Sequence, residues 1–304
     1  MYYPIFSVLT PYLPVLIRKL GYTPSQVGIF LALFEAAGII GPFIFGYLAD
    51  YFKAYKKILI IGCIMIFISA LPIAHLRHPL LTAFFIMLIG MGFRSATTLL
   101  DTIATIQLGK SGNYGKYRSL GSLSFVVFVL FLGWTPFLSP NSTSNIGIWL
   151  IVFTFFAAIT LWLCIKDSKI NNQGENQQAI NTNKIKSNSG KPRGFSKKWN
   201  PIFPLGLLLI AFGRLAHTPV LFLSLYILEE LHSNVIGIAW ALSASSEIPV
   251  IFISRKLIKR FGTLPLLAVS SAVCGIRLLT FICFPSVRGT LGGVLLNSLA
   301  YGLF

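Results

Sequence analysis

Long apolar runs separated by short polar turns make up most of the chain. A helix needs about 20 mostly apolar residues to cross the hydrocarbon core of a bilayer, so each run is typical of a membrane-spanning helix. The pattern predicts ten spans, of which the first and the last are short. They are Tyr2–Leu20, Val27–Ala49, Ile58–His75, Leu80–Leu108, Arg118–Leu138, Ile146–Ile165, Pro201–Leu228, Val235–Ser254, Leu264–Phe284 and Thr290–Phe304. The chain is therefore expected to be an all-α polytopic membrane protein.

Composition agrees with this class. The 304 residues are 55% hydrophobic and only 11% charged, whereas about a quarter of the residues of a soluble protein are charged. The net charge of +17 would suggest a nucleic-acid partner for a soluble protein. Here the basic residues lie mainly in alternate loops, so no nucleic-acid partner is expected. The four cysteines lie in apolar stretches without metal-ligand spacing, and neither a metal nor a cofactor is expected.

Lysine and arginine predict the orientation. Loops rich in these residues remain in the cytoplasm, and the second, fourth, sixth and eighth loops are the rich ones. The polar stretch 166–200 has few large apolar residues and is expected to be a flexible, basic cytoplasmic linker. It divides the chain into residues 1–165, with a shortened first helix, and an incomplete second half at 201–304. The expected location is the cell (inner) membrane.

The two halves are related by an internal repeat. Val27-Gly28-Ile29 in the first half matches Ile236-Gly237-Ile238 in the second, and each copy is followed by a basic turn and another helix. Parallel halves of this kind are typical of transporters, whose site lies between the halves near the middle of the membrane.

Several ionisable residues fall inside the predicted spans, where each charge costs about 2.5–3.5 kcal/mol on insertion scales and marks a candidate functional site. They are Glu35, Arg94, Asp101, Arg214, His217, Glu247 and Arg277, with Arg118 at a helix mouth. Arg94 and Asp101 are about two helical turns apart on one face, and Arg94 is interpreted as a partner of Asp101. The alternative for each residue is a structural ion pair or a side chain that reaches the membrane surface.

Three passages resemble the major facilitator superfamily. The first is Gly46-Tyr47-Leu48-Ala49-Asp50-Tyr51-Phe52, which Lys56 and Lys57 continue. The second is Tyr114-Gly115-Lys116-Tyr117-Arg118-Ser119-Leu120-Gly121-Ser122, and the third is Ser246-Glu247-Ile248-Pro249 with Arg260-Phe261-Gly262 and Gly275-Ile276-Arg277. The last two passages resemble the lactose permease and 3-phenylpropionate permease branch. The resemblance implies a twelve-helix fold, of which about ten helices are expected here.

The resemblance also implies roles for residues. The expected substrate-binding residues are Arg118, Asp101, Glu247, Ser122 and Asn297. The expected proton-coupling residues are Glu247, Arg277, His217 and Glu35. The expected gating residues are Gly46, Asp50, Lys56, Lys57, Arg260 and Gly262. Where lactose permease has a histidine and a glutamate on span 10, this chain has Asn297 and Ala300, neither of which carries a proton. His217 is the natural substitute, because imidazole changes charge near neutral pH.

The function predicted from the sequence is proton-coupled uptake of a small polar solute, such as a sugar, nucleoside or organic acid, by a monomeric carrier powered by the proton gradient. An efflux carrier and a truncated remnant that does not transport are the alternatives. A membrane-embedded enzyme is disfavoured, because the chain has no zinc-binding His-Glu-x-x-His, no Gly-x-Ser-x-Gly turn and no phosphate-binding Gly-Lys-Ser/Thr.

Overall fold

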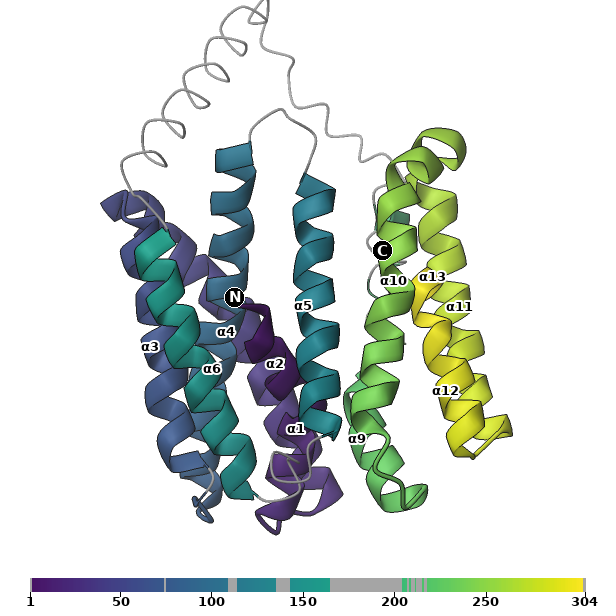
Figure 1. Cartoon of the computed structure of the whole chain (residues 1–304), viewed down its shortest axis with the longest axis horizontal. Helices are drawn as coiled ribbons and strands as arrows, with labels where there is room; N and C mark the ends of the chain where they lie inside the picture. Colours follow the sequence, from purple (N-terminus) through teal and green to yellow (C-terminus); the bar gives the residue numbers. More distant parts are fainter. Residues whose placement is uncertain are drawn as a thin grey trace, which may run out of the picture.

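The computed structural model describes residues 2–73, 75–108, 114–134, 143–164 and 218–302, with scattered helical residues between 204 and 215. Within these residues all regular secondary structure is helical, and the helices lie side by side in a bundle (Figure 1). The prediction of an all-α chain is confirmed. The linker predicted at 166–200 lies outside the described residues, so the division of the chain at this stretch remains a prediction.

The predicted spans of the first half are observed as long helices with ends within a few residues of those expected. They are α1 (Tyr3–Lys19), α2 (Pro24–Phe52), α3 (Tyr55–Ile73), α4 (Pro79–Leu108), α5 (Tyr114–Trp134) and α6 (Thr143–Cys164). The start of α2 is fixed by a capping box, in which Thr23 and Gln26 satisfy each other's backbone N–H groups. The expected turn before α5 is too long, because Tyr114–Tyr117 are helical, and Arg118 therefore lies in the second turn of α5 rather than at its mouth.

The second half departs from the prediction in span seven. Its described part is not a regular α-helix but a 3-10 turn η2 (Thr218–Phe222), a short α9 (Leu223–Leu225) and a π-helical turn η3 (Tyr226–Glu230). Pro219 has no backbone donor and disfavours a regular helix through this point. α10 (Ile236–Phe261) and α11 (Thr263–Cys283) correspond to spans eight and nine.

Two further boundaries differ from the predicted ones. α10 continues past Ser254 through the basic stretch expected in a loop, because lysine and arginine favour helix and lie well at a helix C-terminus. It ends at Gly262, whose φ of 81° only glycine adopts at low cost. The last span is interrupted at Leu296, which separates α12 (Val287–Leu295) from α13 (Asn297–Gly302).

The helices have the length and the surface of membrane spans. In the described residues, five segments are long and apolar enough to cross a bilayer: Pro24–Phe52, Tyr55–Ile73, Pro79–Thr105, Asn145–Leu163 and Thr263–Cys283. Leu120–Trp134 and Ile236–Val250 are shorter apolar helices. Large apolar side chains face outward, such as Phe43 at 75% exposure and Ile282 at 73%. An apolar exterior of this kind is stable against lipid rather than water, and the chain is a multi-pass membrane protein.

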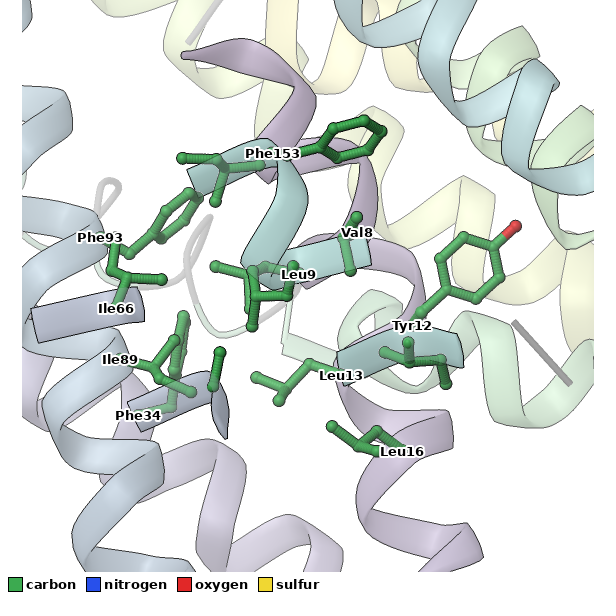
Figure 2. Packing of buried hydrophobic residues seen from close by; sticks show 14 of the residues in the cluster. Val8, Leu9, Tyr12, Leu13, Leu16, Phe34, Ile66, Ile89, Phe93 and Phe153 are labelled. Atoms are coloured by element: carbon green, nitrogen blue, oxygen red, sulfur yellow. The ribbon is translucent and has the colours of Figure 1, made fainter. Parts of the chain in front are cut away.

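The core is organised around α1, whose side chains pack against the neighbouring helices. Figure 2 shows this packing for Val8, Leu9, Tyr12, Leu13, Leu16, Phe34, Ile66, Ile89, Phe93 and Phe153. α2 and α4 approach especially closely at Gly90, where an added Cβ would lie 2.4 Å from the carbonyl oxygen of Phe34. Small residues at such crossings let helix backbones approach closely, and this packing is one of the forces that associate helices in membranes.

The two halves of the chain meet along α5 and α10 (Figure 1). The contact is closest at Gly133 and Gly237, where a Cβ added to either residue would lie 3.0 Å from the Cα of the other. Nearby, α1 contacts α9. Arg18 in the last turn of α1 pairs with Glu229 of η3, with 2.6 Å between Arg18 Nε and Glu229 Oε1. A glycine contact and an ion pair therefore join the halves at the end opposite the basic loops.

Candidate functional site

A chain of hydrogen bonds joins three polar side chains of the second half. Arg277 of α11 donates from Nη1 to Asn297 Oδ1 at the start of α13, and Asn297 donates from Nδ2 to Glu247 Oε1 of α10. Arg277 is 1% exposed and Asn297 is 5% exposed, while Glu247 is half-buried. The structure thus brings together three of the predicted site residues, through an amide that accepts from the cation and donates to the acid.

The break at Leu296 positions Asn297 for this role. The interruption separates α12 from α13, so Asn297 is the first residue of a short helix and its amide lies between α10 and α11. A second bond holds α13 in place, since Ser270 Oγ of α11 donates to the carbonyl oxygen of Ala300 at 2.5 Å. The bonds Arg277–Asn297 and Ser270–Ala300 together hold α13 against one face of α11.

One edge of Arg277 has no partner among the residues that the structure describes. Its Nε and Nη2 atoms are buried and make no hydrogen bond within the part of the chain that the structure describes. The Phe281 ring lies beside the guanidinium, with 5.9 Å between Arg277 Cζ and the ring centroid. A buried charged donor without an acceptor is costly, so this edge is the least satisfied part of the network.

The first half holds a second charged pair. Arg94 Nη2 of α4 lies 2.6 Å from Glu35 Oε1 of α2, and both side chains are more than a third exposed. Gly38 makes room for the arginine, because a Cβ there would lie 2.6 Å from Arg94 Cγ. The interpretation of Arg94 as the partner of Asp101 is wrong: close packing of α2 on α4 gives it Glu35 instead.

The Glu35–Arg94 pair predicts a stability effect. Arg94→Gln leaves a carboxylate without its cation among apolar helices and should lower the free energy of unfolding by about 1–2 kcal/mol. That is less than the roughly 3–5 kcal/mol of a fully buried pair, because water screens side chains this exposed. Thermal unfolding in detergent micelles measures it. The double variant Glu35→Gln/Arg94→Gln should recover most of the lost free energy of unfolding. A loss in the double variant as large as that in Arg94→Gln alone would contradict a direct pair.

The remaining predicted binding residues lie on other helices. Asp101 of α4 and Ser122 of α5 are partly buried in the first half of the molecule. Arg118 belongs to α5, but its side chain lies outside the described part, as does the whole of His217. The grouping of these residues with Glu247 in one site therefore remains a prediction.

The predicted gating residues lie at two helix corners. Asp50 near the end of α2 accepts a hydrogen bond from the Tyr55 hydroxyl at 2.5 Å, and Lys56 Nζ lies 5.7 Å from the centroid of the Trp162 ring of α6. Gly46 and Lys57 lie on the same two helices, α2 and α3.

The corresponding corner of the second half joins α10 to α11. Arg260 stacks on the ring of Phe261 beside Gly262. These contacts shape two similar corners at the basic end of the bundle, and their gating role remains a prediction.

Sequence reasoning missed the contacts between the halves. Neither Arg18 nor Glu229 is among the site residues that the sequence predicts. The consecutive acids Glu229 and Glu230 directly after an apolar span were the available signal, because they lie at the same membrane face as Arg18. Gly133 gave no signal at all, since a glycine in an apolar helix does not reveal which neighbour it approaches.

Comparisons with known proteins agree with the helical fold. A family model described as the MFS_1 like family matches residues 1–304. No curated protein matches the sequence. Among solved structures, a variant of the nucleoside transporter NupG has a TM-score of 0.76 at 14% identity, with 100% of this chain and 78% of that chain covered. The xylose transporter XylE from E. coli, in a partially occluded inward-open conformation, has a TM-score of 0.68 at 13% identity, with coverage of 99% and 79%. At these identities the similarity establishes the fold.

Proposed function

Because the chain belongs to the MFS_1 like family, we propose that it is a secondary active transporter that takes up a small polar solute together with protons by alternating access. The fold is that of the major facilitator superfamily. The observation that supports the proposal most strongly is the Glu247–Asn297–Arg277 network, which holds an acid and a cation inside apolar helices. Ionisable groups placed there are expensive to keep and are by default functional.

The acid of this network is suited to carry the proton. Glu247 is the one Asp or Glu in the sequence from 231 to 304, and it is linked to Arg277 through a neutral amide rather than directly. An ionised Glu247 is attracted to Arg277, while a protonated Glu247 is not, so the proton changes the electrostatic balance of the site. Asn297 does not titrate, and its role is to hold both groups in register.

The contacts between the halves supply the second requirement of a carrier. Alternating access needs the halves to close one end of the site while the other end is open. Arg18–Glu229 and Gly133–Gly237 join the halves opposite the basic corners, which are predicted to be cytoplasmic. We infer that this structure is closed toward the outside and that these contacts separate when the carrier opens outward.

Uptake by proteoliposomes tests the proposal. The 304-residue chain is reconstituted into liposomes whose interior is one pH unit more alkaline than the medium. Radiolabelled uridine, D-xylose and small carboxylates are then added to the medium in turn. One proton per solute supplies about 1.4 kcal/mol, enough for a roughly tenfold accumulation. Accumulation beyond that of protein-free liposomes and its loss when the gradient is collapsed are expected.

Two other results of this assay would overturn the proposal. Absence of flux in either direction would favour a remnant that does not transport. Extrusion of a preloaded solute without uptake would favour an efflux carrier.

A further inference from the structure

The guanidinium of Arg277 presents an unused edge inside the protein. Its Nη1 atom donates to Asn297, while Nε and Nη2 are buried without an acceptor in the described residues. Nε–H and Nη2–H point in parallel, and this edge binds a carboxylate through two parallel hydrogen bonds. Folded proteins rarely leave such donors unsatisfied, so we look for an acceptor beyond the described residues, and a bound solute is one that fits.

The site's own acid does not fill this edge. Glu247 Oε1 accepts from Asn297 Nδ2, and the amide therefore lies between the acid and Arg277. From residue 231 to 304 the sequence has no other Asp or Glu that would supply a second carboxylate from α10, α11, α12 or α13. When Glu247 is protonated, Arg277 has no negative partner in this part of the chain.

The surroundings define the direction of approach. The Phe281 ring lies beside the guanidinium, at 5.9 Å from its carbon to the ring centroid, and Tyr226 lies next to Phe281 with 6.4 Å between ring centroids. A carboxylate that accepts from both Nε and Nη2 lies in the plane of the guanidinium, because both N–H bonds lie in that plane. Arg277 is 1% exposed in this structure, so a ligand reaches this edge only when the helices around it rearrange.

We propose that the Nε/Nη2 edge of Arg277 binds the carboxylate of the transported solute, so that the carrier takes up small organic acids. This rests on the proposed function and names its solute class. Neutral solutes such as nucleosides and pentoses have no negatively charged group that could accept hydrogen bonds from both Nε and Nη2. Protonation of Glu247 and binding of the solute anion at Arg277 then favour each other. Protonation removes the negative charge that repels the anion, and the bound anion neutralises the positive charge of Arg277 that favours an ionised Glu247.

The test compares each acid with its own amide. Thermal unfolding of the purified 304-residue protein is measured in detergent with acetate, lactate, pyruvate, succinate and benzoate, with the corresponding primary amides, and with uridine and D-xylose. At least one carboxylate should raise the unfolding temperature while its amide does not, because the amide lacks the negative charge and the second acceptor.

Variants locate the effect. Arg277→Gln should weaken binding of that carboxylate roughly tenfold or more, and Arg277→Lys should retain part of it, since lysine keeps the charge but not the two-point geometry. Glu247→Gln should strengthen binding by removing a competing negative charge. Arg288→Gln, an exposed arginine on α12, is the matched control and should bind like the unaltered protein.

The outcomes separate the two proposals. Equal effects of a carboxylate and its amide, or unchanged carboxylate binding in Arg277→Gln, would overturn the inference. If Arg277→Gln does not fold, the comparison of acid with amide in the unaltered protein still decides. Binding or uptake of uridine or D-xylose without any carboxylate would reject the inference and leave the carrier intact. Absence of binding and uptake for every solute would reject both.

Discussion

Replacing Glu247 with glutamine is expected to abolish accumulation of solute against its gradient and to leave solute exchange in place. Glutamine keeps the acceptor oxygen that Asn297 uses but does not bind a proton at physiological pH, so the cycle loses its coupled ion. With the interior one pH unit more alkaline, the accumulation ratio should fall from roughly ten toward one. Radiolabelled uptake and counterflow in proteoliposomes measure the two activities separately.

The control for this variant is Glu230→Gln, which makes the same chemical change at an exposed position of η3. It should accumulate solute like the unaltered protein, because Glu230 is exposed and is not part of the Glu247–Asn297–Arg277 network. Full pH-driven accumulation by Glu247→Gln would show that another group carries the proton, with Glu35 and His217 as the remaining predicted candidates.

Replacing Gly237 with tryptophan is expected to hold the carrier open toward the outside. A Cβ at this position would lie 2.8 Å from the Val129 carbonyl oxygen and 3.0 Å from Gly133 Cα. Because backbone atoms have no room to move aside within their helices, α5 and α10 must separate to admit an indole. Net uptake should fall by at least about tenfold, since each cycle requires this contact to close again.

The opening is measured directly as a distance. Spin labels at Ser25→Cys and Asn234→Cys, both exposed positions near the joined end, report the separation of the halves after the native cysteines are replaced by serine. Gly237→Trp should shift the distance distribution outward by several ångströms. Gly292→Trp, where an added Cβ meets nothing within 4 Å, should leave it unchanged. Equal distributions in all three proteins would contradict a closing role for the glycine contact.

Apolar run length predicted most of the helices because a bilayer fixes how long a spanning helix must be. The limits of this signal lie at span seven and at the last span. The run from Pro201 to Leu228 contains Pro219, and its described part is irregular, while the break at Leu296 depends on packing around Asn297. Run length measures hydrophobicity and does not report how the backbone is arranged within an apolar segment.

Partners were harder to predict than positions. The sequence predicts Glu247 and Arg277 as functional residues and Asn297 as a substrate-binding residue, but it does not predict that Asn297 joins the other two. Arg94 was assigned a partner on its own helix, whereas helix packing gives it Glu35, 59 positions away. Pairing within one helix follows from sequence spacing, but pairing between helices depends on which faces pack, and spacing along the chain does not report that.

The most direct measurement of the central claim is the movement of protons caused by solute. Solute is added to proteoliposomes without a preset gradient while a dye reports the external pH. The account predicts that the external medium becomes more alkaline as solute enters through the unaltered protein, and that Glu247→Gln gives no such change. Solute entry without alkalinisation, or alkalinisation that persists in Glu247→Gln, would contradict a carrier whose proton is carried by this acid.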